Sequence, residues 1–569
     1  MIETDKKGCR ELLVQRMILA VVTSVMLQLS LVYCLVLLAN LSIDYTRWFE
    51  DTWTAVMSPR MWAYFTVLAI VTFLQGFLCS KNYLHPPPYY KSRFVKLCKT
   101  VGIQNLFLRA LYIVIGGILV WLHLSLKRGS FSSTADCNVG YETCLMEEYY
   151  FLLFSGFWSG LYLSLKTSNI VGKYFRFPII AQSKFLQLRQ RIYAVLPTLM
   201  ISSMWSTLYY MAVYYFVRSY YRETLFPMQT EMKPLDALSR LLNLSLILQL
   251  WLYQFIFILI ISNTYTLFEI YLTEWASFKF GSSGAYTSDS LEMTLIDVLS
   301  MDKIPIMQHL GYLDLVILAQ KEKTRRGMLF TLSQPGGHPY NWNCVVQKCT
   351  NLLKKFSSDL NTISIKSQEQ PFCYSTLTAR VPPVQQSKYI YHMRKLVPDV
   401  APVLVAETDV REEAPYSGPF IQKFIKQKKE AFVAYLFSKP LINYIFAEQD
   451  DNKIRHALHN GQLVIWAAEA ISSLAVFSLS EDSYGIVQKD VPNIINTVLS
   501  VKQALDKLPK SPVLARKMQA DEKLILGSLR SAIKRSLYRI VTNFELYIND
   551  LSLEASIIEQ LQGFLNYKE

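Results

Sequence analysis

Six long stretches almost free of charge fill the first half of this chain and limit what it can fold into. They cover residues 17–43, 61–80, 110–126, 149–165, 192–217 and 241–268, and none contains an Asp or a Glu. A helix rises about 1.5 Å per residue, so about 20 apolar residues cross a hydrocarbon core about 30 Å thick. Since lipid cannot hydrogen-bond to backbone amides, each stretch is predicted to be a membrane-spanning helix.

Charges in the connecting loops predict the orientation of these helices. Residues 81–109 and 166–191 each carry six Lys or Arg and no acid, whereas the first, third and fifth loops carry mixed charges. Lys and Arg near the ends of spans stay on the cytoplasmic side of a membrane. We therefore expect residues 1–16 and the C-terminal half on the cytoplasmic or nucleoplasmic side. The first stretch is too long for a cleavable signal peptide and is predicted to be a signal anchor.

Two of the nine cysteines, Cys137 and Cys144, fall in the third loop on the predicted luminal side. Disulfides persist in oxidising compartments, so this pair is a candidate disulfide, with two free thiols as the alternative. Cys344 and Cys349 lack a second pair of ligands, which argues against a zinc site. We predict no metal and no cofactor.

The predicted spans lack the groups that membrane catalysis or transport requires. Carriers and membrane enzymes keep ionisable residues inside the bilayer, and here His123 is the only histidine within a span. Two alternatives remain: a carrier, and an enzyme of the endoplasmic reticulum membrane, for which His85 and His338 are the only reasonable starting points. The net charge of +14 suits anionic lipid head groups. No nucleic-acid-binding motif accompanies this charge, so sequence-specific binding of nucleic acid is not expected.

The pattern of residues 269–363 predicts a helical block beside the membrane, interrupted by a tight turn. Pro-Gly-Gly at residues 335–337 and His-Pro at residues 338–339 cannot continue a helix. An aromatic residue lies at each end of this turn, at positions 330 and 342. The turn is either a structural corner between helices or a loop that binds a partner. Its candidate partner-binding residues are Ser333, Pro335, Gly336, Gly337, His338, Pro339 and Trp342.

Prolines spread through residues 364–417 predict an irregular linker, and helical periodicity resumes in residues 418–569. The first helix of this region is basic and amphipathic. Such a helix suits either the surface of a membrane or a core with one solvated face. Its candidate membrane-surface residues are Phe420, Ile421, Lys423, Phe424, Lys428, Lys429, Phe432 and Leu436.

Three more helices are predicted near the C-terminal end. The first covers residues 461–479, and the second follows an N-cap at Asp490 with Pro492 in its first turn. Apolar residues at spacings of three and four, from Leu526 to Phe544, define the third. Its opposite face is basic, which suits either solvent or an acidic partner. Candidate partner-binding residues on these helices are Trp466, Arg530, Lys534, Arg535 and Arg539.

The fold class is therefore predicted as all-α. A six-helix transmembrane bundle precedes a mainly α-helical cytoplasmic or nucleoplasmic domain, with an irregular linker between its parts. Several phrases along the chain are similar to those of the metazoan Ndc-type transmembrane nucleoporin. They lie in the same order at residues 177–180, 184–186, 241–246, 332–342, 484–488 and 504–507. Ser-Gln-Pro-Gly-Gly-His-Pro at residues 333–339 is the most specific of them.

This resemblance implies a six-span protein of the nuclear envelope with both termini on the cytoplasmic or nucleoplasmic side. Such proteins anchor the nuclear pore complex in the membrane, support its assembly and are not enzymes. Their C-terminal half binds soluble nucleoporins, and the implied partners are the lipid bilayer, aladin and membrane-binding inner-ring nucleoporins. Vertebrate members have a longer Ser/Pro-rich linker than residues 364–417, so no partner motif of that linker is carried over to this chain.

Overall fold

The computed structural model describes most of the chain outside the central linker. The described residues are 5–39, 44–84, 89–126, 134–136, 143–145, 147–169, 177, 182–225, 241–280, 293–332, 337–368, 439–446, 450–508 and 520–566. The chain forms two compact units. One combines Met1–Ser364 with Gln449–Glu569, and the other is Ile365–Glu448. Within the second unit, the described residues include the short helix α15 (Pro440–Phe446).

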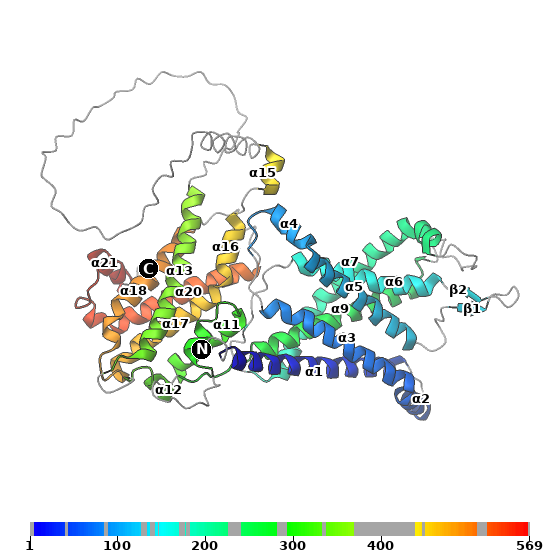
Figure 1. Cartoon of the computed structure of the whole chain (residues 1–569), viewed down its shortest axis with the longest axis horizontal. Helices are drawn as coiled ribbons and strands as arrows, with labels where there is room; N and C mark the ends of the chain where they lie inside the picture. The colour runs from blue at the N-terminus through cyan, green and yellow to red at the C-terminus, as the bar shows by residue number, and fades with distance from the viewer. Residues whose placement is uncertain are drawn as a thin grey trace, which may run out of the picture. The chain divides into compact units, whose positions relative to one another are not determined.

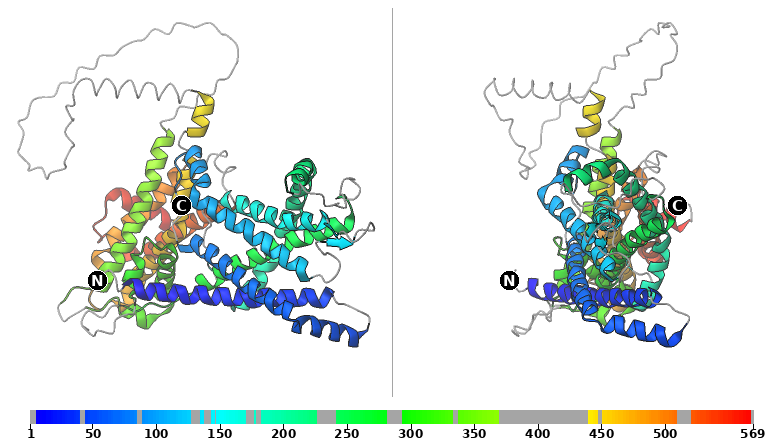
Figure 2. Two further views of the ribbon diagram at one scale, coloured as in Figure 1. Left: turned by 45° about the vertical axis from the view of Figure 1, so that its right-hand side comes forward. Right: turned by 90° about the vertical axis from the view of Figure 1, so that its right-hand side faces the viewer.

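Helices occupy all six predicted stretches of the N-terminal half (Figure 1). The elements in chain order are α1 (Asp5–Ala39), α2 (Tyr45–Met57), α3 (Pro59–Leu84), α4 (Arg93–Val101), α5 (Ile103–Leu126), α6 (Glu147–Asn169), α7 (Lys184–Leu225) and α9 (Leu244–Leu272). Helix α1 packs along α3 and α9, α5 packs along α6, and α7 packs along α9. Figure 2 shows the whole chain, including this bundle, in two further views.

The predicted count of six membrane spans is slightly too high. Among the described residues, five segments are long and apolar enough to cross a membrane: Gly8–Cys34, Met61–Ser80, Asn105–Leu124, Leu244–Leu272 and Gly461–Glu481. The first four coincide with predicted spans, whereas the fifth is a helix of the C-terminal domain that is mostly buried inside the protein. Helices α6 and α7 fall short because Tyr and Ser, whose polar hydroxyl groups lower the mean hydropathy, recur along both helices.

Close backbone approach is the main feature of the contact between α5 and α6. A Cβ atom placed on Gly160 would lie 2.3 Å from the Tyr112 carbonyl oxygen, and one on Gly116 would lie 2.3 Å from the Gly156 carbonyl oxygen. Gly156 and Gly160 form a G-x-x-x-G pattern, which allows membrane helices to pack backbone against backbone. Glycine at these positions is therefore required by the packing of the bundle.

One element departs from the all-α prediction. Strands β1 (Thr134–Asp136) and β2 (Thr143–Leu145) form a two-stranded antiparallel sheet in the third loop. Ala135 pairs with Cys144 in this ladder. Cys137 lies outside the described residues, as does the side chain of Cys144, so the candidate disulfide stays a prediction.

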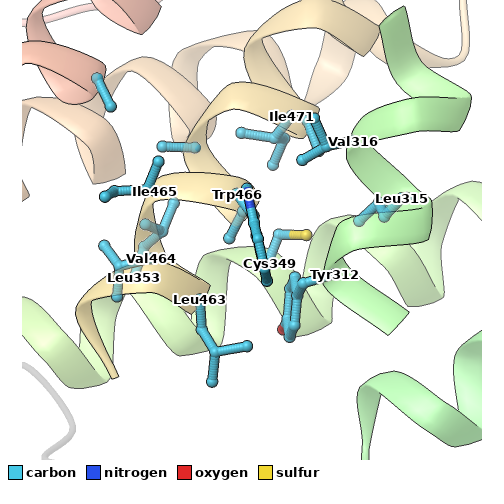
Figure 3. Packing of buried hydrophobic residues seen from close by; sticks show 14 of the residues in the cluster. Tyr312, Leu315, Val316, Cys349, Leu353, Leu463, Val464, Ile465, Trp466 and Ile471 are labelled. Carbon is cyan, nitrogen blue, oxygen red and sulfur yellow. The ribbon is translucent and has the colours of Figure 1, made fainter. Parts of the chain in front are cut away.

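The C-terminal half is helical and shares one hydrophobic core. Its elements are α10 (Leu295–Leu299), α11 (Pro305–Lys321), α12 (Lys323–Gly327), α13 (Tyr340–Gln368), α16 (Asp450–His459), α17 (Gly461–Glu481), η1 (Val487–Lys489), α18 (Val491–Lys507), α20 (Ala520–Asn543), η2 (Glu545–Tyr547) and α21 (Ala555–Leu565). Helix α17 packs against both α11 and α20. Figure 3 shows Trp466 of α17 pointing toward Cys349 of α13 and Tyr312 of α11. Residues before and after the predicted linker therefore build the same core.

Two predicted helix starts in the C-terminal half match the observed ones. Helix α17 begins at Gly461, and α18 follows Asp490 as its N-cap with a proline in the first turn, as predicted. The Asp490 side chain makes no capping hydrogen bond to α18. Its carboxylate instead accepts a hydrogen bond from Trp342, so this residue joins two helices.

Candidate membrane-anchoring junction

A buried carboxylate organises the point at which the chain leaves the last span and enters the C-terminal half. Asp314 of α11 is 0% exposed. Its Oδ1 accepts a hydrogen bond from Trp275 Nε1 at 3.1 Å, and its Oδ2 accepts one from the backbone N–H of Phe278 at 3.0 Å. Both donors follow α9 directly. The chain just after the last span is therefore held against the C-terminal half by a charged acceptor, and such hydrogen bonds are stronger than neutral ones.

Arg325 of α12 neutralises this carboxylate. Its guanidinium donates to both oxygens of Asp314, at 3.1 and 2.7 Å. The same group donates to Glu322 at 2.8 Å and to the Phe278 carbonyl oxygen at 2.7 Å. A buried charge is tolerated only when it is paired and hydrogen-bonded, and both conditions are met here. We call Trp275, Phe278, Asp314, Glu322 and Arg325 the junction clamp.

The first helix of the chain reaches the same place. Arg16 of α1 donates hydrogen bonds to the carbonyl oxygens of Leu272, Glu274 and Trp275, at 3.4, 2.7 and 3.4 Å. Cys9 and Leu13 of α1 belong to the hydrophobic core cluster that contains the helices of the C-terminal half. The start of α1 therefore packs beside the junction clamp.

The basic fourth loop also contacts the junction. Lys184 forms an ion pair with Glu274 at 2.9 Å, and Arg191 forms one with Glu269 at 3.2 Å. The Phe177 ring packs edge-on against Trp466 with centroids 4.9 Å apart. Two of the basic residues that predicted the orientation of the spans therefore have specific acidic partners in the structure.

His309 of α11 lies in the same aromatic cluster as Phe177 and Trp466. The Phe177 and His309 rings are stacked with centroids 5.9 Å apart. His309 Nδ1 donates to the Pro305 carbonyl oxygen at 2.7 Å, and burial lowers the pKa of this imidazole to about 3. His309 is therefore neutral at physiological pH and acts here as a packing residue.

The second loop contacts α16 of the C-terminal half. Asn452 Nδ2 donates to the Tyr90 carbonyl oxygen at 3.5 Å, and the rings of Tyr89 and His456 have centroids 5.2 Å apart. The start of α1, the second loop and the fourth loop thus all contact the C-terminal half.

A second charged pair lies next to the clamp and joins α12 to α17. Two hydrogen bonds of 2.7 Å connect the Arg326 guanidinium with the Glu481 carboxylate, and these bonds lower the pKa of Glu481. The Arg326 guanidinium also lies over the Phe477 ring at 3.9 Å, within the range of cation–π attraction.

The structure changes the interpretation of both candidate tryptophans. Trp342 is 0% exposed, and its Nε1 donates to Asp490 Oδ2 at 2.8 Å. Trp466 is also buried. Both side chains pack in the core of this structure, and their role in partner binding stays a prediction.

The rest of the tight turn is only partly described. Ser333, Pro335 and Gly336 lie outside the described residues. His338 is exposed, and Gly337 and Pro339 are half-buried. With Trp342 in the core at one end of the phrase, the interpretation as a corner between helices gains support. A contact through the exposed part stays a prediction.

The four basic residues of α20 that were predicted as partner contacts do not share one environment. Arg530 donates to the Leu505 carbonyl oxygen at 3.4 Å, and Arg539 donates to the Ser473 hydroxyl. Both are half-buried, whereas Lys534 and Arg535 are exposed. Only these last two are placed to meet a partner. The predicted membrane-surface helix at residues 420–436 lies outside the described residues.

A bundle that contains helices long and apolar enough to cross a membrane, and that continues through a charged junction into a helical domain, defines a polytopic membrane protein with a large extramembrane half. The model of the family described as "Nucleoporin protein Ndc1-Nup" matches residues 11–562, and the chain belongs to this family. This confirms the resemblance found in the sequence and places the chain among nucleoporins rather than enzymes.

Relatives from vertebrates and insects align along almost the whole chain. Nucleoporin NDC1 of Mus musculus is 25% identical over 653 residues, covering 97% of this chain and 96% of the mouse protein. Nucleoporin NDC1 of Homo sapiens is 25% identical over 623 residues, covering 92% of each chain. Nucleoporin Ndc1 of Drosophila melanogaster is 24% identical over 582 residues, covering 99% of each chain.

Proposed function

We propose that this chain anchors the nuclear pore complex in the nuclear envelope and supports pore assembly. Its helical bundle is held in the bilayer, and its C-terminal half binds soluble nucleoporins, with aladin and membrane-binding inner-ring nucleoporins as the partners. The junction clamp is the observation that carries this proposal. It fixes the start of the C-terminal half to the end of α9 through a buried, paired carboxylate.

A fixed junction suits a protein that holds a scaffold at a membrane. Several apolar helices make departure from the bilayer effectively irreversible. Each partner site on the C-terminal half is then restricted to a thin layer beside the membrane, which raises its effective concentration for a partner that is also membrane-bound. Modest individual contacts can therefore hold a large assembly in place.

The contacts of the loops support a single side for both termini. The start of α1, the second loop and the fourth loop all contact the C-terminal half, and the two loops are the basic ones. Since basic loops stay on the cytoplasmic side, we place the N-terminus and the C-terminal half on the cytoplasmic or nucleoplasmic side of the nuclear envelope.

Two exposed basic residues of α20 are the proposed partner contact within the described part of the C-terminal half. Lys534 and Arg535 are both exposed, and the Arg535 side chain has only a distant ion pair, 3.7 Å from Glu469. We propose that these two residues meet an acidic segment of a soluble nucleoporin.

Reversing both charges, in a Lys534→Glu and Arg535→Glu double variant, is expected to weaken nucleoporin binding about tenfold. Exposed ion pairs contribute about 1 kcal/mol or less each, and like charges across an interface repel. The measurement is recovery of soluble nucleoporins on the purified full chain in lipid nanodiscs. Lys303→Glu, at another exposed lysine of the C-terminal half, is the matched control and should leave recovery unchanged.

The outcomes of this experiment separate the two parts of the proposal. Recovery that falls with the double variant and not with the control supports both the function and the contact. Equal recovery with every variant supports the function and excludes α20 as the contact. If the wild-type chain recovers no soluble nucleoporin, the proposed function is wrong.

A further inference from the structure

The short helix α4, at the end of the second loop, carries a row of exposed apolar side chains. Phe94 is 41% exposed, Leu97 is 61% exposed and Val101 is 57% exposed, and no residue of α4 is buried. With Cys98, which is also exposed, these residues recur at spacings of three and four. Such spacing places them on one face of the helix.

The opposite face of α4 is basic. Arg93, Lys96 and Lys99 recur at a spacing of three, and Lys91 precedes the helix. No Asp or Glu occurs anywhere from residue 81 to residue 109. The helix therefore separates exposed apolar groups from positive charges, and no acid lies near it in the sequence.

The apolar face continues onto a membrane-spanning helix. Gly102 ends α4, and α5 starts at the next residue. Ile103 is 87% exposed, Leu106 and Phe107 are exposed as well, and the segment Asn105–Leu124 is apolar enough to cross a membrane. These exposed residues of α5 face lipid if α5 spans the bilayer. The apolar face of α4 thus begins where the lipid-facing surface of α5 reaches the edge of the hydrocarbon core.

Contacts at both ends hold α4 in place. Ser92 caps the helix by accepting a hydrogen bond from the Val95 N–H at 3.3 Å. At the other end, Asn105 Nδ2 of α5 donates to the Lys99 carbonyl oxygen at 2.5 Å. Tyr89 and Tyr90, just before the cap, contact α16. Helix α4 is therefore fixed between a span and the C-terminal half.

We propose that α4 lies in the head-group layer of the membrane and binds anionic phospholipids. A helix with an apolar face, a Lys- and Arg-rich polar face and a position at the end of a span matches the chemistry of an interfacial helix. Anionic lipids attract each basic residue near the surface, and the energy falls off within a Debye length. The inference rests on the chain spanning a membrane, and it does not depend on nucleoporin binding.

Amide hydrogen exchange of residues 93–101 tests this proposal on the full chain in nanodiscs. Nanodiscs of phosphatidylcholine alone are compared with nanodiscs that also contain phosphatidylserine. We expect slower exchange of α4 with phosphatidylserine. In Lys96→Gln and Lys99→Gln variants, the added protection should fall about fivefold for each lysine neutralised, since each basic residue contributes about 1 kcal/mol near an anionic surface. Raising the salt concentration should remove the extra protection that phosphatidylserine gives to α4.

Lys303→Gln, on the C-terminal half, is the matched control and should not change the exchange of α4. Equal exchange of α4 in both kinds of nanodisc would overturn the proposal. Protection that arises only after a second protein is added would also overturn it, because the apolar face would then be a protein-docking surface. Since both leaflets of a nanodisc have the same composition, the result does not depend on the proposed orientation or on nucleoporin recovery.

Discussion

Replacement of Arg325 by alanine is expected to destabilise the C-terminal half by about 3–5 kcal/mol. The carboxylate of Asp314 is fully buried and receives two hydrogen bonds from Arg325. Removal of one partner of a buried pair leaves an uncompensated charge, and this is strongly destabilising. The change should lower the unfolding midpoint of the full chain in nanodiscs and speed proteolysis of residues 273–280.

Arg535→Ala provides the matched control for this variant. Its side chain is 61% exposed and lies 3.7 Å from Glu469. Exposed ion pairs contribute at most about 1 kcal/mol, so little change in the unfolding midpoint is expected. If Arg325→Ala and Arg535→Ala lowered stability equally, the junction clamp would not be a major source of stability.

Replacement of Gly160 by leucine is expected to disrupt the packing of α5 against α6 at a cost above about 3 kcal/mol. A single Cβ atom at this position would lie 2.3 Å from the Tyr112 carbonyl oxygen and 2.7 Å from the Ile113 Cα. Overpacking of a core usually costs about 1–3 kcal/mol when side chains can move, and here the obstacle is backbone. The yield of monodisperse protein in detergent and its unfolding midpoint should both fall.

Gly527→Ala in α20 is the control for this change. No atom lies within 4 Å of its added Cβ, and alanine favours a helix over glycine by about 0.5–1 kcal/mol. The unfolding midpoint should therefore stay the same or rise. A fully stable, monodisperse Gly160→Leu protein would contradict the close packing of α5 and α6.

The membrane half of the fold was largely predictable because a span has a local signature. A charge-free stretch of the right length is visible in the sequence without any tertiary information, and helices occur at all six such stretches. Composition was less decisive for α6 and α7, whose Tyr and Ser residues leave them below the hydropathy that marks α3 or α9. The resemblance carried by phrases such as residues 332–342 was confirmed by the family match.

The junction clamp could not be predicted, because its members are brought together only by tertiary contacts. Asp314 and Arg325 are 11 residues apart, and Phe278 is 36 residues from Asp314. The burial of Trp342 could not be predicted for the same reason. Its Nε1 partner, Asp490, lies 148 residues away, and a tryptophan at the end of a Pro-Gly-Gly turn gives no local indication that it is buried.

The measurement that tests the proposed anchoring role most directly is the position of the full chain, carrying a fluorescent tag, in the membranes of living cells. Anchoring of the nuclear pore complex predicts discrete spots at the nuclear rim that coincide with soluble nucleoporins. A uniform distribution through the endoplasmic reticulum, with no enrichment at pores, would contradict it.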